Sequence, residues 1–264
     1  MKYLINKPNL SNLEKKYVLK AIKSTWLSAN GENTKIFEKK ISKIIKNKYC
    51  LAVQSGTASL HLALKSLGVK PSDKVIVPNY TCVSNLSAVN QCGATSILVD
   101  IEKETLGLDF KLVEEAYKKY KPKYLQLVHV YGFPARDTYK IINFCKKNKI
   151  KIIEDTSEAL GSKINGKVVG SFGDINVTSI RSEKMIGVGE GAIISTNYKK
   201  IFEKFTLLAS RSAPFRTSKD PYWKKYFVSG EGYNYLMPHL LGSVARGQIE
   251  RFKKDLIKKK NQSR

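Results

Sequence analysis

The chain repeats one local pattern, in which short apolar runs rich in β-branched residues are bounded by turn residues and separated by stretches of helical periodicity. The runs are Cys50–Val53, Lys74–Val77, Thr95–Val99, Tyr124–Val128, Ile150–Ile153, Ile175–Ser179 and Ala192–Ser195. Such runs are typical of strands that are buried on both faces. Their alternation with helices predicts an α/β fold with a mainly parallel sheet between helices.

Helices are predicted between most of these strands and near both ends of the chain. They cover Asn12–Ser24, Thr34–Lys46, a segment that follows Ser55-Gly56-Thr57 and runs through Leu67, Phe110–Lys119, Asp137–Asn148, a segment from Lys199, and Leu240–Lys260. Pro214 and Pro221 indicate a loop before the last helix. No internal repeat or low-complexity linker divides the 264 residues, so we expect one large domain over residues 1–264 with a helical segment at its N-terminus.

The formal net charge of +25 raises the question of a nucleic-acid partner. The excess is mostly lysine, spread along the chain in short doublets such as Lys39-Lys40 and Lys118-Lys119. A protein that reads nucleic acid more often concentrates arginine and aromatic residues on one face. We therefore interpret the charge as a compositional bias on a solvated surface and expect no nucleic-acid partner.

Cysteine usage and the N-terminal sequence indicate a soluble cytoplasmic protein. The four cysteines, Cys50, Cys82, Cys92 and Cys145, form no CxxC motif and stand at no zinc-ligand spacing, which favours a reducing compartment and no metal site. The N-terminus lacks the apolar region of a secretion signal. No run of about 18 apolar residues is present, so no membrane span is expected.

Polar residues follow many of the apolar runs, at the end of a strand where open α/β sheets bind ligands. They are Ser55-Gly56-Thr57, Tyr80-Thr81, His129, Glu154-Asp155 and Lys184. The Ser-Gly-Thr triplet precedes a helix, whose unpaired N–H groups and positive dipole end suit a phosphate. The same triplet is also compatible with an ordinary helix cap, and the residues leave both interpretations open.

Asp155 and Lys184 add two further chemical groups. A carboxylate at the end of a strand can hold a cationic ring nitrogen, although Asp155 could equally cap a following helix. Lys184 stands before a glycine-rich turn among apolar residues, where a desolvated lysine can act as a Schiff-base nucleophile, whereas most lysines are merely solvated. A phosphate cradle, an acid for a ring nitrogen and a lysine for an aldehyde are the contacts that pyridoxal phosphate needs, and no other common cofactor needs this combination.

Eight segments together resemble a known family in their order along the chain, from about Ala21 to Arg251. They are TWLSANGENTKIFEKKIS, VQSGTASLHLAL, DKVIVPNYTCVSNLSAV, GATSILVDIEKETLGLD, HVYGFPARD, IIEDTSEALGSKINGKVVGSFGD, SIRSEKMIGVGEGAIIST and GYNYLMPHLLGSVARGQIERF. The chain thereby resembles the DegT/DnrJ/EryC1/StrS family of pyridoxal-phosphate-dependent sugar aminotransferases. The resemblance implies the large domain of a fold type I transferase, which is similar to that of aspartate aminotransferase.

The resemblance also assigns roles by position. Lys184 is implied as the Schiff-base lysine, Asp155 as the partner of the pyridine nitrogen, and Glu158 as a neighbour of the ring hydroxyl. The residues implied to hold the phosphate are Gly56, Thr57 and Ser179.

Three further positions concern the surroundings of the cofactor. Asn234 matches an asparagine that reaches the phosphate of the other subunit, which implies a homodimer with shared active sites. The region of Ser28 matches a segment close to the sugar nucleotide. Cys82 stands where the family usually has an aromatic residue that stacks on the cofactor ring, and a thiol is a smaller cover.

The resemblance implies an aminotransferase that converts a nucleotide-linked keto sugar to an amino sugar in surface polysaccharide biosynthesis, with glutamate as the amino donor. A sugar dehydratase is disfavoured, because those relatives replace the lysine with histidine and Lys184 is present here. The family usually continues into a small C-terminal domain, which we expect to be absent or truncated after about residue 251. A relative that binds the cofactor or the sugar nucleotide without turnover is therefore the alternative.

Overall fold

The computed structural model describes residues 8–213, 227–228 and 230–262. The loop expected from Pro214 and Pro221 lies outside these residues. The described helices are α1 (Asn12–Lys23), α2 (Glu32–Ile45), α3 (Gly56–Leu67), α4 (Ser84–Gln91), α5 (Phe110–Tyr120), α6 (Thr138–Lys147), α7 (Lys199–Ala209) and α8 (His239–Gln262), with a short 3₁₀ turn η1 (Val130–Gly132). The predicted helices are confirmed within a few residues, whereas α4 was not predicted.

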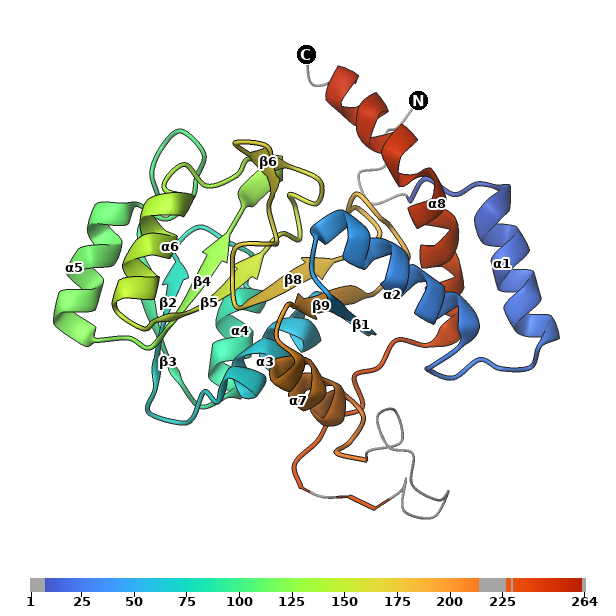
Figure 1. Ribbon diagram of the computed structural model, residues 1–264, viewed down its shortest axis with the longest axis horizontal. Coiled ribbons are helices and arrows are strands. Elements are labelled where there is room, and N and C mark those ends of the chain that lie inside the picture. Colours follow the sequence, from blue (N-terminus) through green and yellow to red (C-terminus); the bar gives the residue numbers. More distant parts are fainter. Residues whose placement is uncertain (1–7, 214–226, 229, 263–264) are drawn as a thin grey trace.

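Seven described strands form one sheet in the order β1-β9-β8-β5-β4-β2-β3 (Figure 1). Their bounds are β1 (Tyr49–Val53), β2 (Lys74–Pro78), β3 (Thr95–Val99), β4 (Tyr124–Val128), β5 (Lys151–Asp155), β8 (Ile175–Ser179) and β9 (Ala192–Thr196). A separate antiparallel pair is formed by β6 (Lys163–Ile164) and β7 (Lys167–Val168). The neighbours from β3 through β8 are parallel, and β9 runs antiparallel to both β8 and β1. The prediction of a mainly parallel sheet is confirmed.

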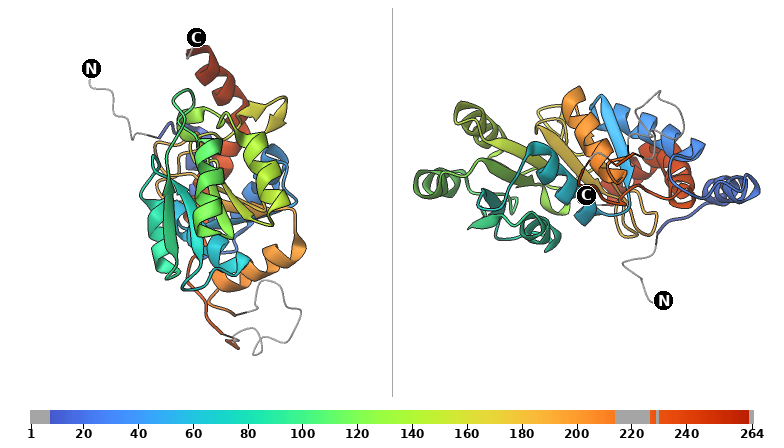
Figure 2. Two further views of the ribbon diagram at one scale, coloured as in Figure 1. Left: turned by 90° about the vertical axis from the view of Figure 1, so that its left-hand side faces the viewer. Right: turned by 90° about the horizontal axis from the view of Figure 1, so that it is seen from below.

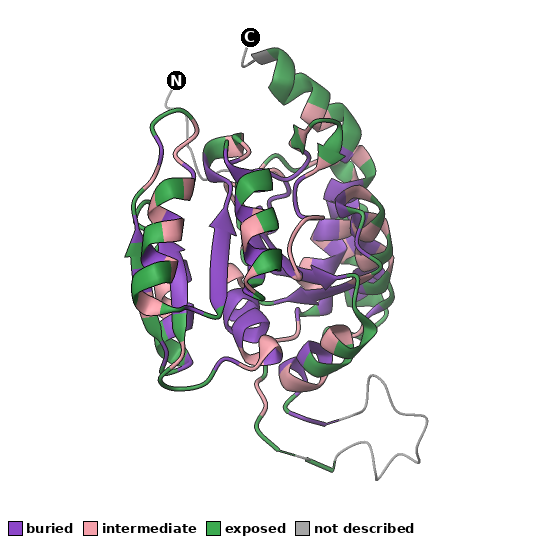
Figure 3. Ribbon diagram, turned by 60° about the vertical axis from the view of Figure 1, so that its left-hand side comes forward, coloured by how far each residue is buried: buried purple, intermediate pink, exposed green. Residues whose placement is uncertain are grey.

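Helices cover both faces of this sheet. One face packs against α3, α4 and α7 around residues such as Leu62 and Phe205. The other face packs against α5 and α6 at one end and against α2 and α8 at the other. The right-hand view of Figure 2 shows α1 at one end of the molecule and α5 toward the opposite end. The strands are therefore largely buried, while the helices expose their outer sides (Figure 3).

The N-terminal helices α1 and α2 rest on α8, far away in sequence. The Tyr17 hydroxyl donates to Glu250 Oε2 at 2.9 Å, and Arg251 Nε pairs with Glu14 Oε1 at 3.1 Å. Gly242 permits the close approach of α8 to α2, since a Cβ there would lie 2.0 Å from Thr34 Oγ1. None of the helices in the described ranges is long and apolar enough to cross a membrane.

The strand directions decide where a ligand can bind. Because β1 and β8 both run antiparallel to β9, the carboxyl end of β1 lies at the same edge as those of β2, β4, β5 and β8. The segments that follow these strands therefore meet at one edge of the sheet. This is the edge at which α/β sheets bind ligands.

Candidate active site

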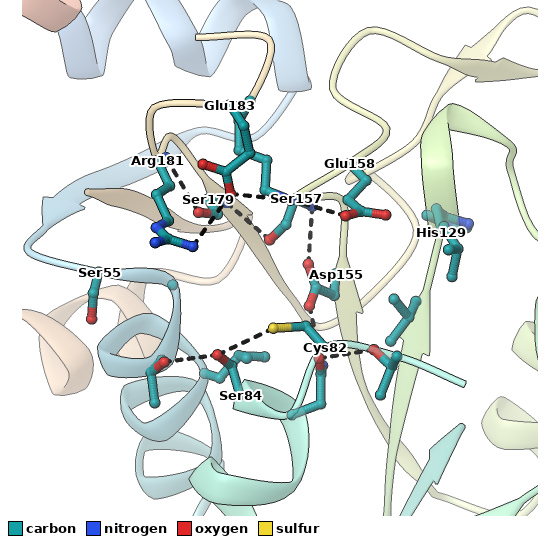
Figure 4. A pocket seen from close by; sticks show the side chains of 18 of the residues that line it. Ser55, Cys82, Ser84, His129, Asp155, Ser157, Glu158, Ser179, Arg181 and Glu183 are labelled. Atoms are coloured by element: carbon teal, nitrogen blue, oxygen red, sulfur yellow. Dashed lines mark hydrogen bonds and ion pairs between the residues drawn. The ribbon is translucent and has the colours of Figure 1, made fainter. Parts of the chain in front are cut away.

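A cavity of about 500 Å³ opens at this edge (Figure 4). Its walls come from the segments that follow β1, β2, β4, β5 and β8. Seven of the residues that the family resemblance places at the cofactor line it, namely Gly56, Thr57, Cys82, Asp155, Glu158, Ser179 and Lys184, and so do the further candidates Ser55, Tyr80, Thr81 and His129. The structure thus brings together residues as far apart in the sequence as Ser55 and Lys184.

The wall at the start of α3 offers hydrogen-bond donors. Ser55 is the N-cap, and its Oγ accepts from the Ala58 N–H at 3.1 Å. The amides of Gly56 and Thr57 are the first two of the helix and have no acceptor within it. A Cβ at Gly56 would lie 3.3 Å from Ser179 Cβ, tighter than most real contacts. The start of α3 therefore has both a side-chain cap and unpaired amides that suit an anion. Because Gly56 has no side chain, the space between α3 and Ser179 stays open.

Asp155 ends β5 and is 4% exposed. Its Oδ2 accepts from Asn85 Nδ2 at 3.1 Å, and its Oδ1 accepts from the Ser157 N–H at 2.9 Å. The possibility that Asp155 caps a following helix is wrong, because residues 156–162 form turns that lead to β6. The carboxylate is thus held at the cavity wall by two neutral donors and forms no ion pair with another residue of the described ranges.

Lys184 forms an ion pair with Glu158. The distance from Lys184 Nζ to Glu158 Oε1 is 2.9 Å, and the side chains are 18% and 32% exposed. The second carboxylate oxygen of Glu158 accepts from the Tyr131 N–H at 2.9 Å. The expectation of a lysine in apolar surroundings is therefore corrected, since a carboxylate lies within hydrogen-bond reach and can take up or return a proton of the amine.

Ser179 ends β8 and lines the cavity beside Gly56 at the start of α3. Its N–H donates to Ser157 Oγ at 3.0 Å, which ties β8 to the turn that follows Asp155. Arg181 lies two residues further on and also lines the cavity. Its hydrogen bond to Glu190 raises the pKa of the guanidinium, which stays cationic at every relevant pH.

Cys82 and two tyrosines line the open side of the cavity. Cys82 is exposed, and its Sγ lies 3.5 Å from Ser84 Oγ. The hydroxyls of Tyr80 and Tyr131 are 2.9 Å apart, and both side chains are exposed. Figure 4 shows Asp155 between Cys82 on one side and Glu158 on the other.

Asn234 and Ser28 do not line this cavity. Asn234 is exposed and pairs with Ser210, beyond the end of α7. Ser28 is exposed in the loop between α1 and α2, and its carbonyl accepts from the His239 N–H at 3.2 Å. Neither residue reaches the ligand space of its own chain.

Sequence reasoning missed Asn85, Ser157 and Arg181 as cavity residues. Asn85 is fully buried on α4 and also donates to Gln126 Oε1 at 2.7 Å. A polar residue on the buried side of a short helix would have been the signal, but α4 itself was not predicted. Within the described ranges, no three His, Cys, Asp or Glu side chains gather as a metal site.

Comparison with known proteins gives a consistent result. Residues 8–263 match the profile of the DegT/DnrJ/EryC1/StrS aminotransferase family. The chain is 36% identical over 251 residues, 95% of its length, to the GDP-perosamine synthase of Escherichia coli O157:H7. It is 30% identical over 254 residues, 94% of its length, to the putative pyridoxal phosphate-dependent aminotransferase EpsN of Bacillus subtilis (strain 168). It spans 66% and 63% of these two relatives.

A solved structure shares the fold. The chain superposes on 3-amino-5-hydroxybenzoic acid synthase with a TM-score of 0.86 at 27% sequence identity. The superposition covers 94% of this chain and 63% of that one. The large-domain architecture expected from the sequence is therefore confirmed.

Selective modification of Cys82 tests the accessibility of the cavity. Burial raises the pKa of Cys92 to about 11 and that of Cys145 to about 12, and it raises the pKa of Cys50 further. A raised pKa leaves little thiolate at pH 8, so these three thiols should react slowly. We expect one thiol per folded chain to react with a maleimide, and peptide mapping should place it at Cys82.

The matched control is Cys82→Ser, which should abolish the fast reaction without changing the far-ultraviolet circular dichroism. Fast labelling that persists in Cys82→Ser would show that the exposed position of this side chain is wrong.

Proposed function

Because the chain belongs to the DegT/DnrJ/EryC1/StrS aminotransferase family, we propose that it is a pyridoxal-phosphate-dependent aminotransferase. Its proposed substrate is a nucleotide-linked keto sugar, and its product is the amino sugar for surface polysaccharide biosynthesis. The observation that carries this proposal is the one cavity shared by Asp155, Lys184 and the first amides of α3. The substrate class is supported by the similarity to the GDP-perosamine synthase of Escherichia coli O157:H7.

The residues of the cavity fit pyridoxal phosphate. The free amides of Gly56 and Thr57 suit the phosphate, and Gly56 leaves room for it beside Ser179. Asp155 accepts hydrogen bonds from two neutral donors and can pair with a protonated ring nitrogen. When bound, the cofactor supplies an electron sink for the carbanion that forms at the amino-acid carbon.

Lys184 and Glu158 handle the protons in the proposed reaction. Lys184 would hold the cofactor at its aldehyde, and its amine is the group that would take up and return a proton at the reacting carbon. Glu158 Oε1 lies 2.9 Å from this amine and can accept its proton. Tyr131 fixes the orientation of Glu158 through its backbone N–H.

Several finer points belong to the same proposal. Glutamate is the proposed amino donor, and residues 1–264 form the proposed cofactor-binding large domain. Cys82 is the proposed neighbour of the ring in place of an aromatic residue. The proposed location is the cytoplasm, which the four free cysteines support.

A homodimer with shared sites is proposed as well. Asn234 is exposed and does not line the cavity of its own chain, so its side chain is accessible to a second subunit. In the proposed dimer, Asn234 adds an amide donor to the phosphate that Gly56 and Thr57 hold in the partner. The exposed tyrosines Tyr80 and Tyr131 beside the cavity supply apolar area for such a contact.

Covalent trapping tests the proposed function. After incubation with pyridoxal phosphate and reduction with borohydride, peptide mapping should find the pyridoxyl group on Lys184. Lys184→Arg should give no labelled peptide, while the exposed Lys199→Arg control should label as the wild type does. A pyridoxyl group mainly on another lysine would overturn the role of Lys184.

Subunit mixing tests the shared site. Lys184→Ala and Asn234→Ala subunits should each be nearly inactive alone. Random pairing makes half of the dimers mixed, each with one intact site, so about a quarter of the wild-type activity should return. No recovery in confirmed mixed dimers would contradict a shared site.

A further inference from the structure

A buried histidine lies behind the ion pair of the active site. His129 directly follows β4 and has no exposed surface. Its Nδ1 is 3.0 Å from the Ala135 backbone N, and its Nε2 is 3.1 Å from Glu154 Oε1. A backbone N–H can only donate, so Nδ1 carries a lone pair and the ring proton is on Nε2. The imidazole therefore donates to Glu154 and accepts from Ala135.

Glu154 gives this histidine a fixed anchor. Its side chain is fully buried, and its carboxylate also accepts from the backbone N–H groups of Gly170, Phe172 and Gly173, the last two at 2.7 and 2.9 Å. Successive side chains of a strand point to opposite faces, so Glu154 points away from the side on which Asp155 meets the cavity. The anchor is thus separate from the proposed cofactor contacts.

The loop of residues 130–135, which His129 contacts at Ala135, is connected to Lys184 through hydrogen bonds. Tyr131 lies in this loop with a φ of 51°, a left-handed conformation that is unfavourable for residues other than glycine and must be held by its surroundings. Its N–H donates to Glu158 Oε2, and Glu158 Oε1 accepts from Lys184, both at 2.9 Å. A continuous series of hydrogen bonds and backbone therefore connects Glu154 to the lysine.

We infer that His129 is a positioning residue, whose Nδ1 bond to Ala135 fixes the loop of residues 130–135 so that Tyr131 orients Glu158 toward Lys184. The consequence for Lys184 chemistry rests on the proposed function, whereas the hydrogen-bond series itself does not. The loop has other attachments, since Ser162 Oγ donates to the Gly132 carbonyl at 2.8 Å and the Arg136 N–H donates to Thr105 Oγ1 at 2.9 Å. Loss of the histidine bond should therefore shift the loop without unfolding it.

Two substitutions separate the bonds of the imidazole. In His129→Asn, the amide oxygen can occupy the place of Nδ1 and keep the bond to Ala135 while the bond to Glu154 is lost. In His129→Gln, the longer side chain can keep the donor to Glu154, but the acceptor at the place of Nδ1 is lost. If the Nδ1 bond fixes the loop, the two variants differ, and His129→Asn behaves as the wild type does at the loop.

Amide hydrogen exchange by nuclear magnetic resonance measures the loop without cofactor. In His129→Gln, the amides of Ala135 and Tyr131 should exchange about tenfold faster, the size expected for loss of one buried hydrogen bond. Exchange at Leu62 in α3 should be unchanged, which shows that the variant is folded. His129→Asn should match the wild type at all three amides.

The rate at which added pyridoxal phosphate is trapped on Lys184 gives the second readout. We expect trapping to be about tenfold slower in His129→Gln than in the wild type, because the loss of one hydrogen bond at the loop changes the position of Glu158 beside Lys184. His129→Asn should trap the cofactor at the wild-type rate. Equally fast amide exchange in both variants, or wild-type exchange of Tyr131 in His129→Gln, would overturn the inference. If the wild type itself traps no cofactor, the proposed function fails, and the amide exchange still decides the role of His129.

Discussion

The common direction of β1, β2, β4, β5 and β8 is the constraint on which the site depends. Backbone hydrogen bonds between parallel strands place their carboxyl ends at one edge, and each following segment then begins there. Helix α3 starts after β1, Asp155 ends β5, and Ser179 ends β8. These residues are far apart in the sequence: several strands and helices separate the start of α3 from Asp155, and the β6–β7 pair separates Asp155 from Ser179. The antiparallel β9 preserves the arrangement, since it leaves β1 in the direction of the others.

The two adjacent carboxylates at the end of β5, Glu154 and Asp155, differ in their hydrogen-bond partners. Glu154 is surrounded by backbone donors and His129, so its hydrogen-bonding capacity is used within the fold. Asp155 points to the cavity with two neutral donors and can accept a further proton-bearing group. Because successive side chains of a strand point to opposite faces, these two neighbouring residues lie in different surroundings.

The ion pair with Glu158 distinguishes Lys184 from most other lysines of the described ranges. Most lysines of the described ranges are exposed, and a fixed partner is of little energetic value to them. Lys184 is largely buried, and its carboxylate partner is itself held by a backbone N–H. The amine therefore has a defined position and a proton acceptor beside it.

Much of the fold could be predicted from the sequence, because buried parallel strands leave a strong local pattern. Thr95–Val99, Tyr124–Val128 and Ile175–Ser179 are strands over the predicted residues. Helix α4 could not be predicted, because it has eight residues and little apolar periodicity, and Asn85 was missed with it. The position of Asp155 at the end of a strand was predicted correctly, whereas its hydrogen-bond partner Asn85 is a tertiary contact.

The partner of Lys184 could not be predicted for the same physical reason. Glu158 lies 26 residues away in the sequence, and only the parallel pairing of β5 with β8 brings their following turns together. The apolar neighbours of Lys184 in the sequence gave the opposite expectation. Local sequence therefore indicates which residues are near the sheet edge, and tertiary packing decides what each one contacts.

A crystal structure of the chain with added pyridoxal phosphate would show whether these residues hold the cofactor. We expect density continuous with Lys184 Nζ, a phosphate at the amides of Gly56 and Thr57 beside Ser179, and a ring nitrogen at Asp155. Density for the cofactor outside this cavity, or an empty cavity at saturating cofactor, would contradict this expectation.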